Sequence, residues 1–296
     1  MQGWITEGAV TVNGRPVRRV AARCAPGAVV AIVLPETAAP TPSAIEPDPA
    51  TLDVLFEDAH LLAVNKPAGI VVHPTHAHAS GTLMNALVWY ARDWPAMCRP
   101  SIVGRLDKLT SGIVVVAKTA AIHAALQRSL ATTTAEKEYL AVVYGRVDVP
   151  AGRIALRLSR DSGDRRRMVT SDDRGAASLT RFERLGRVAA RRAGLALLKC
   201  RLVTGRTHQI RAHLASRGWP IVGDPTYGEP RWSSVLDVSL AAALRAFPRQ
   251  ALHAWRLALV HPITQSRLEI RAPIPEDLQT LLAASGLDGV VEAPSS

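Results

Sequence analysis

Short apolar runs and one helical stripe dominate the pattern of hydrophobic and polar positions from residue 51 onward. In the helical stripe, Ile122, Leu126 and Leu130 recur at the spacing of one helix face. Thr119 precedes this stripe and is a favourable N-cap residue, so we expect the helix to run from Thr119 to Leu130. The apolar runs are bounded by turn residues and predict strands at Leu61–Val64, Ile113–Ala117, Leu140–Val143 and Leu195–Val203.

The predicted strands and helices do not follow a strict strand–helix–strand rhythm. A strict alternation would indicate a parallel sheet, whereas this mixture favours an α+β fold with a mixed, largely antiparallel sheet. Pro275 and the two acidic residues after it predict the start of a last helix. We therefore expect one large domain over residues 51–286, followed by a flexible tail at 287–296.

Residues 1–34 have the pattern of a separate small unit. Apolar and polar residues alternate on both sides of Val12–Asn13–Gly14, which predicts a hairpin turn. A further strand is expected after the turn at Pro26–Gly27. Residues 35–50 contain five prolines among alanine, threonine and serine, so we expect an extended linker between the two domains.

The charge of the chain restricts its partners. Its formal net charge is +11 and its isoelectric point is near 10.4, and arginine carries most of the surplus. Such a surplus attracts polyanions, which indicates RNA, DNA or an anionic membrane surface. A general arginine bias with solvated charges is the alternative. The chain has 296 residues, 48% of them hydrophobic, and can therefore bury a sizeable core.

The three cysteines give no sign of a metal site or of a disulfide framework. Cys24, Cys98 and Cys200 are odd in number and too far apart for a paired motif, so we expect reduced, semi-buried thiols. The first residues lack the basic and apolar segments of a signal peptide, and no run approaches the roughly twenty apolar residues that span a bilayer. We expect a cytoplasmic protein without membrane contact.

The segment GRLDKLTSG at 104–112 places a carboxylate between an apolar residue and a predicted turn at Thr110–Gly112. Asp107 in this setting suits a nucleophile, and an N-cap or turn residue is the alternative. A carboxylate that stays ionised in a partly dry pocket needs a cationic partner. Arg105 lies two residues earlier and would face the same side as Asp107 on an extended strand.

A second polar segment, TGRTHQIRAH at 204–213, supplies the missing cation. Arg211 is the candidate partner for the carboxylate. Either Thr204 or Thr207 is expected to cap the helix that begins in this segment. Backbone N–H groups there, together with Arg206 and the threonine hydroxyls, are suited to cradle a phosphate.

Other side chains in and near this segment are candidates for supporting roles. His208 and His213 lack the glutamate and the third ligand of a zinc site, so we expect hydrogen-bonding roles and no metal. Ile210 points around the helix away from His208 and offers an apolar floor. In EKEYLAVVYG at 136–145, Tyr139 is predicted at the entrance of a strand, where ordinary packing is the alternative to a functional role.

Together these motifs resemble the RluA-type pseudouridine synthases, enzymes that isomerise uridine in structured RNA. Further matching segments are NKPAGIVVHP at 65–74, PIVGDPTYG at 220–228 and LHAWRLALVHP at 252–262. The resemblance covers roughly residues 51–275. We expect the segment at 65–74 to form a wall of the pocket, and the other two segments to act mainly as scaffold.

The resemblance implies a role for each candidate residue. It implies that Asp107 is the nucleophile and Arg211 its charge partner. Tyr139 is implied to stack on the uracil and to help remove the proton from carbon 5, with Ile210 beneath the base. Arg105 is implied to fill the gap that the flipped nucleotide leaves. Further substrate-binding residues are Arg206, Thr207 and His208. Because an isomerisation has no redox or group-transfer step, no metal or cofactor is implied, and we expect a monomer.

The resemblance also limits the substrate. Members of the family modify large-subunit ribosomal RNA or transfer RNA. Residues 1–34 resemble the second half of the S-four-like RNA-binding fold without its first helices, and such an appendage favours the ribosomal substrate. Residues 160–174 carry five arginines and four aspartates, which suits a finger that grips RNA or a solvated loop. RluA-type proteins usually have histidine at the position of Gly104, where glycine is more typical of the RsuA-type branch.

Two other functions stay open at the level of sequence. A catalytically inactive RNA-binding or ribosome-assembly factor on the same fold would agree with Gly104 and with the partial N-terminal unit. Against it, pure binding does not need a carboxylate that faces RNA phosphates. A DNA-acting base flipper such as a glycosylase would agree with the charge but not with the spacing of the motifs.

Overall fold

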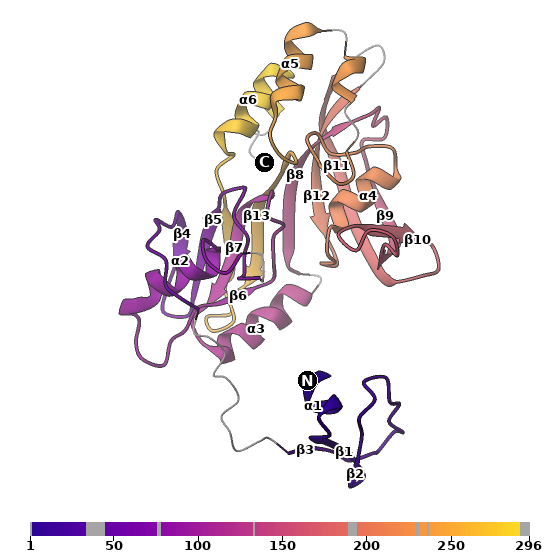
Figure 1. The fold of residues 1–296 in the computed structure, drawn as a ribbon. Coiled ribbons are helices and arrows are strands. Elements are labelled where there is room, and N and C mark those ends of the chain that lie inside the picture. The colour runs from indigo at the N-terminus through magenta and orange to yellow at the C-terminus, as the bar shows by residue number, and fades with distance from the viewer. Residues whose placement is uncertain are drawn as a thin grey trace. The chain divides into compact units, whose positions relative to one another are not determined.

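The computed structural model describes residues 2–33, 45–75, 78–132, 134–188, 194–228, 231–235 and 237–290. The chain separates into two compact units, Met1–Ile45 and Glu46–Ser296, and Figure 1 shows the fold of each. Most of the predicted linker, and residues 291–296 of the predicted tail, lie outside the described residues.

The small unit is a three-stranded antiparallel sheet with one short helix. Its elements are α1 (Gln2–Thr6), β1 (Val10–Val12), β2 (Arg15–Pro16) and β3 (Val30–Ile32), with the strands in the order β2–β1–β3. Asn13 and Gly14 have φ angles of 50° and 78°, as the central residues of a type I′ hairpin turn do. The predicted hairpin and the strand after Pro26–Gly27 are confirmed.

The large unit is built on one mixed sheet, in which eleven strands pair within the described part of the chain. The main path runs β10–β9–β11–β12–β8–β13–β7–β5–β4, while β14 pairs with β13 and β6 with β7. The pairing of β13 with β7 is parallel and the others are antiparallel. The predicted α+β class is confirmed. The strands are β4 (Val54–Glu57), β5 (Leu61–Lys66), β6 (Ser101–Val103), β7 (Ser111–Ala117), β8 (Glu136–Tyr144), β9 (Ala151–Arg160), β10 (Met168–Ser171), β11 (Ala176–Val188), β12 (Leu195–Leu202), β13 (Leu252–Val260) and β14 (Arg267–Arg271).

Helices accompany this sheet along its length (Figure 1). They are α2 (Leu83–Tyr90), α3 (Ala120–Ala131), α4 (Gln209–Ser216), α5 (Val238–Ala246) and α6 (Glu276–Ala284), with 3₁₀ turns at Ala91–Asp93, Arg231–Ser234 and Asp288–Val290. Helix α3 contacts β6, β7 and β13, and α4 contacts β9, β10 and β11. The predicted helix after Thr119 is confirmed, since Thr119 Oγ1 accepts a hydrogen bond from Ile122 N–H. Ile122 and Leu126 are buried in the core beneath α3.

The middle of the sheet is apolar on both faces. Residues 140–144 of β8 and 195–198 of β12 are at most 2% exposed. All four predicted strands are present, but β8 begins at Glu136, so Tyr139 lies inside the strand and not at its entrance. The early start has a physical cause, because Glu136 and Glu138 form ion pairs with Arg256 of the neighbouring β13.

The ends of the large unit differ from the predicted ones. Asn85 of α2 donates a hydrogen bond to Glu46 O and accepts one from Asp48 N–H, which ties the end of the predicted linker to the large unit. At the other end, Leu287 is 2% exposed in the core and Asp288–Val290 form a 3₁₀ turn. The predicted tail therefore starts too early.

The thiols are free but not alike. Cys98 is half-buried and Cys200 buried, whereas Cys24 is exposed, so the expectation of a semi-buried residue is wrong there. Cys24 follows an irregular stretch of the small unit and has no packed layer over it. Burial raises the pKa of the Cys200 thiol to about 12. No helix in the described ranges is both long and apolar enough to cross a membrane.

Candidate active site

Asp107 lies on the loop that joins β6 to β7, at residues 104–110. Leu106 is 9% exposed and packs into the core, which turns its two neighbours outward. Arg105 is exposed and Asp107 is half-buried. Arg105 is therefore on a loop and not on a strand as predicted, although it shares an outward orientation with Asp107.

The turn after Asp107 comes earlier than predicted. Thr110 N–H donates to Asp107 O at 3.0 Å, which closes a turn with Lys108 and Leu109 at its centre. The residues after Thr110, expected in the turn, already belong to β7 and pair with β13. The parallel pairing with β13 thus shortens the loop and fixes the carboxylate close to the first residue of β7.

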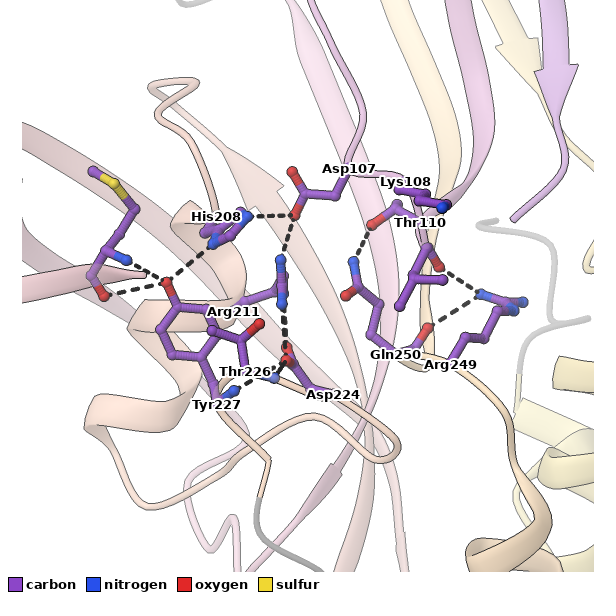
Figure 2. Close-up of polar contacts among 12 residues, drawn as sticks. Asp107, Lys108, Thr110, His208, Arg211, Asp224, Thr226, Tyr227, Arg249 and Gln250 are labelled. Carbon is purple, nitrogen blue, oxygen red and sulfur yellow. Dashed lines mark hydrogen bonds and ion pairs between the residues drawn. The ribbon is translucent and has the colours of Figure 1, made fainter. Parts of the chain in front are cut away.

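Two polar side chains hold this loop from behind. Lys66 is fully buried and its Nζ donates to three backbone carbonyls, one of which is Lys108 O at 3.2 Å. Gln250 Nε2 donates to Thr110 Oγ1 at 2.6 Å (Figure 2). Burial lowers the pKa of Lys66 to about 8. These contacts order the loop on the side away from solvent.

The segment at 65–74, which the sequence predicts as a wall of the Asp107 pocket, lies elsewhere. Several of its residues line a separate cavity of about 640 Å³, together with residues 48–53. Two contacts hold the segment to the loop at Lys108, because Lys66 Nζ and Gly69 N–H both donate to Lys108 O. The predicted location of this segment is wrong.

Gly104 begins the loop with a φ of +91°, a region that favours glycine. A Cβ at this position would meet nothing within 4 Å, so a side chain would cause conformational strain without a clash. We expect Gly104→Ala to lower the free energy of unfolding by about 1 kcal/mol, measured by urea denaturation. Gly205→Ala is the matched control, because Gly205 has open space but no positive φ. Equal stability of the two variants would contradict the strain.

Helix α4 begins without the predicted threonine cap. His208 is the N-cap residue and has a left-handed backbone, with φ 54° and ψ 18°, and its side chain makes no cap bond. The side-chain oxygen of Gln209 instead accepts hydrogen bonds from Arg206 N–H at 3.0 Å and Thr204 Oγ1 at 2.8 Å. The prediction of Thr204 or Thr207 as the cap is wrong. The hydroxyl of Thr204 instead accepts a hydrogen bond from Leu179 N–H, and the Gln209 side chain orders the turn that precedes the helix.

Arg211 of α4 links two carboxylates (Figure 2). Its Nη1 donates to Asp107 Oδ2 at 2.8 Å, while Nε and Nη2 donate to the two oxygens of Asp224 at 2.7 and 2.8 Å. The exposed fraction of the side chain falls from 19% for Asp107 to 5% for Arg211 and 0% for Asp224. The structure thus brings the predicted pair together and adds a buried anchor behind it.

Charge pairing sets the ionisation of Arg211 and Asp224. Burial by itself raises the pKa of Asp224, yet hydrogen bonds from Arg211 and from two backbone N–H groups hold that pKa below its usual value. Burial likewise opposes the charge of Arg211, but its two carboxylate partners raise its pKa further above the usual range. Arg211 is therefore a permanent cation, and Asp224 balances it whatever happens at Asp107.

Tyr227 joins these charges to a neighbouring strand. Its hydroxyl oxygen lies 3.1 Å from His208 Nδ1 and 2.7 Å from the backbone nitrogen of Met168, at the start of β10. Its ring centroid lies 5.1 Å from the guanidinium carbon of Arg211. On the other side, His208 Nε2 is 3.8 Å from Asp107 Oδ2. Burial lowers the pKa of His208, so the imidazole is neutral near pH 7.

A cavity of about 490 Å³ opens beside the carboxylate. Predicted site residues in its lining are Asp107, Arg105, Tyr139, Arg206, Thr207 and His208. Arg211 and Ile210 line a smaller recess that also includes Asp107 and Tyr139. Ile210 is 4% exposed and belongs to the main core, so it does not form the floor of the larger cavity.

Sequence reasoning assigns residues 220–228 to scaffold and so misses two members of the site, Asp224 and Tyr227. The available signal was an aspartate two residues after the apolar pair Ile221–Val222, because a carboxylate that is buried with such a run needs a cation. Lys66 is likewise a charged residue at the end of an apolar strand, and such a residue needs polar partners if it is buried. Across the described ranges, no group of three or more histidine, cysteine, aspartate or glutamate side chains is placed to hold a metal ion.

An ionised carboxylate beside a cavity, on a chain this basic, suits an enzyme that acts on the bases of a nucleic acid. Comparison with known proteins narrows this class. Residues 60–216, more than half of the chain, match the model of the family described as RNA pseudouridylate synthase. The chain belongs to this family and is an RNA pseudouridine synthase, an isomerase.

Individual relatives agree with the family. An RNA pseudouridine synthase of Bacillus subtilis, described as uncharacterized, is 39% identical over 95% of this chain and 87% of its own length. The ribosomal large subunit pseudouridine synthase D of Xanthomonas campestris is 40% identical, over 95% of this chain and 82% of its own. Among solved structures, the human RNA pseudouridylate synthase domain containing 1 is 26% identical, with a TM-score of 0.60 over 80% of this chain and 90% of its own. The resemblance inferred from the motifs is confirmed.

Proposed function

We propose that the enzyme isomerises specific uridines with Asp107 as the nucleophile and Arg211 as its charge partner. The observation that carries this assignment is the 2.8 Å ion pair between the two side chains at the cavity. Because Asp107 is the more exposed of the two, the carboxylate is open to a ligand while the arginine lies behind it. Asp224 supports the pair by holding the other edge of the guanidinium.

The reaction breaks the C1′–N1 glycosidic bond of uridine, turns the uracil and forms a C1′–C5 bond. C5 loses a proton and N1 gains one, so no oxidant, reductant or transferred group is consumed. A carboxylate that attacks either the ribose or the uracil ring can hold the intermediate while the base turns. Arg211 fixes the direction of the Asp107 carboxylate through a charge-assisted hydrogen bond.

The target nucleotide has to leave its stack before it can reach the carboxylate. Arg105 is exposed, lies two residues before Asp107 and lines the same cavity. Its planar guanidinium can stack and hydrogen-bond in the gap that the nucleotide leaves. We assign this gap-filling role to Arg105, and contacts with the flipped nucleotide to Arg206, Thr207 and His208. Ile210 supports the smaller recess from the core.

Tyr139 is proposed to stack on the uracil and to accept the proton from C5. Burial, and then the charge of Asp107, raises the pKa of its phenol well above the usual value, so the free enzyme holds it protonated. The phenol must therefore give up its own proton before it can act as a base. N1 gains a proton when the glycosidic bond breaks, so Tyr139 donates its proton there and then, as the phenolate, accepts the proton that C5 loses. We expect Tyr139→Phe to keep RNA affinity but to lose on the order of 10²-fold or more in turnover, in an assay of pseudouridine formation. A Tyr139→Phe variant with normal turnover would restrict Tyr139 to stacking.

RNA contacts outside the cavity are proposed for residues 160–174, the predicted finger. The hairpin of β9 and β10 lies here, and its connection to β11 follows. Arg165, Arg166 and Arg174 are exposed, and the Arg167 guanidinium carbon lies 5.4 Å from the ring centroid of Tyr227. Because phosphate contacts by arginine release counterions, we expect RNA affinity to fall steeply with salt.

Large-subunit ribosomal RNA is the substrate that we propose, ahead of transfer RNA. Several relatives 36–41% identical to this chain are named ribosomal large subunit pseudouridine synthase D. The small unit, with four arginines among residues 15–23, supports the same choice if it binds RNA. We further propose a cytoplasmic monomer that needs no metal or cofactor, because the reaction has no redox or group-transfer step.

A map of pseudouridine across total RNA tests this function, by carbodiimide labelling and reverse transcription in cells with and without the gene. We expect one or more sites in large-subunit ribosomal RNA to be lost on deletion and restored by the wild type, but not by Asp107→Asn. A site in transfer RNA that behaves this way would name the other substrate. If no site changes, the assignment fails and a binding role replaces it.

A further inference from the structure

The hydroxyl of Tyr227 has three polar neighbours but only one proton to donate. It lies 2.7 Å from Met168 N, 3.2 Å from Met168 O and 3.1 Å from His208 Nδ1. The residue is 8% exposed, so water has little access to it. A hydroxyl has one proton to donate and accepts through its lone pairs. The Met168 N–H can only donate, so the hydroxyl proton goes either to Met168 O or to His208 Nδ1.

The choice between these two acceptors decides the tautomer of His208. A neutral imidazole carries one N–H, and its other nitrogen is an acceptor. If the Tyr227 hydroxyl donates to Nδ1, the proton of His208 is on Nε2. If the hydroxyl donates to Met168 O instead, Nδ1 carries the proton and Nε2 presents a lone pair.

Asp107 lies on the Nε2 side and separates the two possibilities. Its Oδ2 is 3.8 Å from His208 Nε2, and an ionised carboxylate can only accept. An N–H on Nε2 is attracted to this oxygen, whereas a lone pair is repelled by it. The contact between the Tyr227 hydroxyl and Nδ1 is 3.1 Å long and is present in both cases, so the charge of Asp107 decides between them. That charge favours a hydroxyl that donates to His208.

The backbone of His208 supports a fixed ring orientation. Its left-handed φ of 54° is unfavourable for a residue other than glycine, so neighbouring contacts have to hold it. The Tyr227 ring packs edge-on against the imidazole, with centroids 5.7 Å apart and an angle of 87° between the planes. The strained residue therefore places an imidazole between a tyrosine hydroxyl and the reactive carboxylate.

We propose that Tyr227 is a positioning residue that sets the tautomer of His208, so that Nε2–H faces Asp107. Through this N–H, the buried tyrosine steers the oxygen that attacks the substrate, without touching the substrate itself. The importance of the effect for turnover rests on the proposed role of Asp107 as nucleophile. Other charged groups that act on His208 are Arg211, Asp224 and Arg105.

The direct test is the nitrogen NMR spectrum of histidine side chains in the free, full-length protein labelled with ¹⁵N. His208→Gln identifies the His208 signals by their loss. We expect the wild type to show the Nε2–H tautomer near pH 7, and Tyr227→Phe to shift His208 towards Nδ1–H. Tyr90→Phe is the control, because it removes another tyrosine hydroxyl, bonded to Glu57, and should leave the His208 signals unchanged. A wild type in the Nδ1–H form, or an unshifted Tyr227→Phe, overturns the proposal.

A kinetic cycle gives a second readout and guards against a merely structural effect. We expect Tyr227→Phe to lower kcat about tenfold while RNA affinity stays within twofold, which corresponds to about 1.4 kcal/mol. In the His208→Gln background, whose amide has no tautomer to set, the same substitution should have little effect on kcat. Equal losses in both backgrounds would contradict the proposal. The tautomer is measured without substrate, so an inactive wild type would refute the proposed function alone.

Discussion

Asp107→Asn is expected to reduce pseudouridine formation by on the order of 10⁴-fold or more, the scale seen when a nucleophile is removed. The amide has nearly the shape of the carboxylate but is not a nucleophile. Arg211 loses its charged partner at 2.8 Å, yet it keeps both hydrogen bonds to Asp224 and so does not become an unpaired buried charge. The fold and the affinity for RNA should therefore survive.

Single-turnover assays on an RNA substrate, together with filter binding and urea denaturation, separate these effects. We expect normal binding within about twofold and a change in unfolding free energy below about 1 kcal/mol, as for a half-exposed group. Asp53→Asn is a matched control. Asp53 is on the same unit and accepts a hydrogen bond from Asn65, but it does not line the cavity beside Asp107. Retained turnover in Asp107→Asn would refute the assignment of the nucleophile.

Asp224→Asn is expected to be costly for both stability and turnover. The substitution removes the fully buried partner of Arg211 and leaves only the more exposed Asp107 to balance its charge. We expect a loss of about 3 kcal/mol in unfolding free energy. The amide cannot accept at both positions from Arg211, so the guanidinium loses its anchor and shifts towards Asp107. A displacement of this kind should lower kcat by about 10²-fold.

The dependence of stability on pH tests whether the lost charge of Asp224 is the cause of the lower stability. The pKa of Asp224 is lowered in the folded protein, so its contribution is fully present above the ordinary value near 4. This contribution is lost as the pH falls through the lowered, folded-state pKa. We expect the wild type to lose stability steeply below pH 4, and Asp224→Asn to lose less over the same range.

A control variant has to remove a paired carboxylate elsewhere on the unit. Glu57→Gln does so at the sheet edge, where Glu57 and Lys118 form an ion pair at 2.7 Å. We expect it to lower stability but to leave kcat unchanged. If Asp224→Asn showed normal stability and turnover, the ion pair with Asp224 would have no part in holding Arg211 against Asp107.

The parts of the fold that were predictable are those whose signals are local. Thr119 and the stripe of Ile122 and Leu126 lie within one helix and its cap, so a short window contains the whole argument. The buried strands are equally predictable, because an apolar run between turn residues is visible in the sequence without knowledge of any distant partner. The class of the sheet followed from the order of these elements.

What sequence reasoning missed depends on distant contacts. Lys66 was hidden because its partner Lys108 is 42 positions away, and the position of Asp224 beneath Arg211 appears only once α4 has packed on the sheet. The pairing of Asp107 with Arg211 was predictable since an ionised carboxylate requires a cation. The prediction of the cap of α4 failed for a similar reason, because the hydroxyl of Thr204 accepts a hydrogen bond from Leu179, which is 25 positions away.

Strand β13, residues 252–260, lies between β8 and β7 although it follows both of them far along the sequence. In the described sheet, β7 with the Asp107 loop is joined to β8 with Tyr139 only through this strand. In a nascent chain, the strands on the two sides of the site are therefore not joined in one sheet until residue 260 has emerged from the ribosome. The enzyme should stay inert until β13 has been translated, and messages cut short before β13 should yield proteins without catalysis.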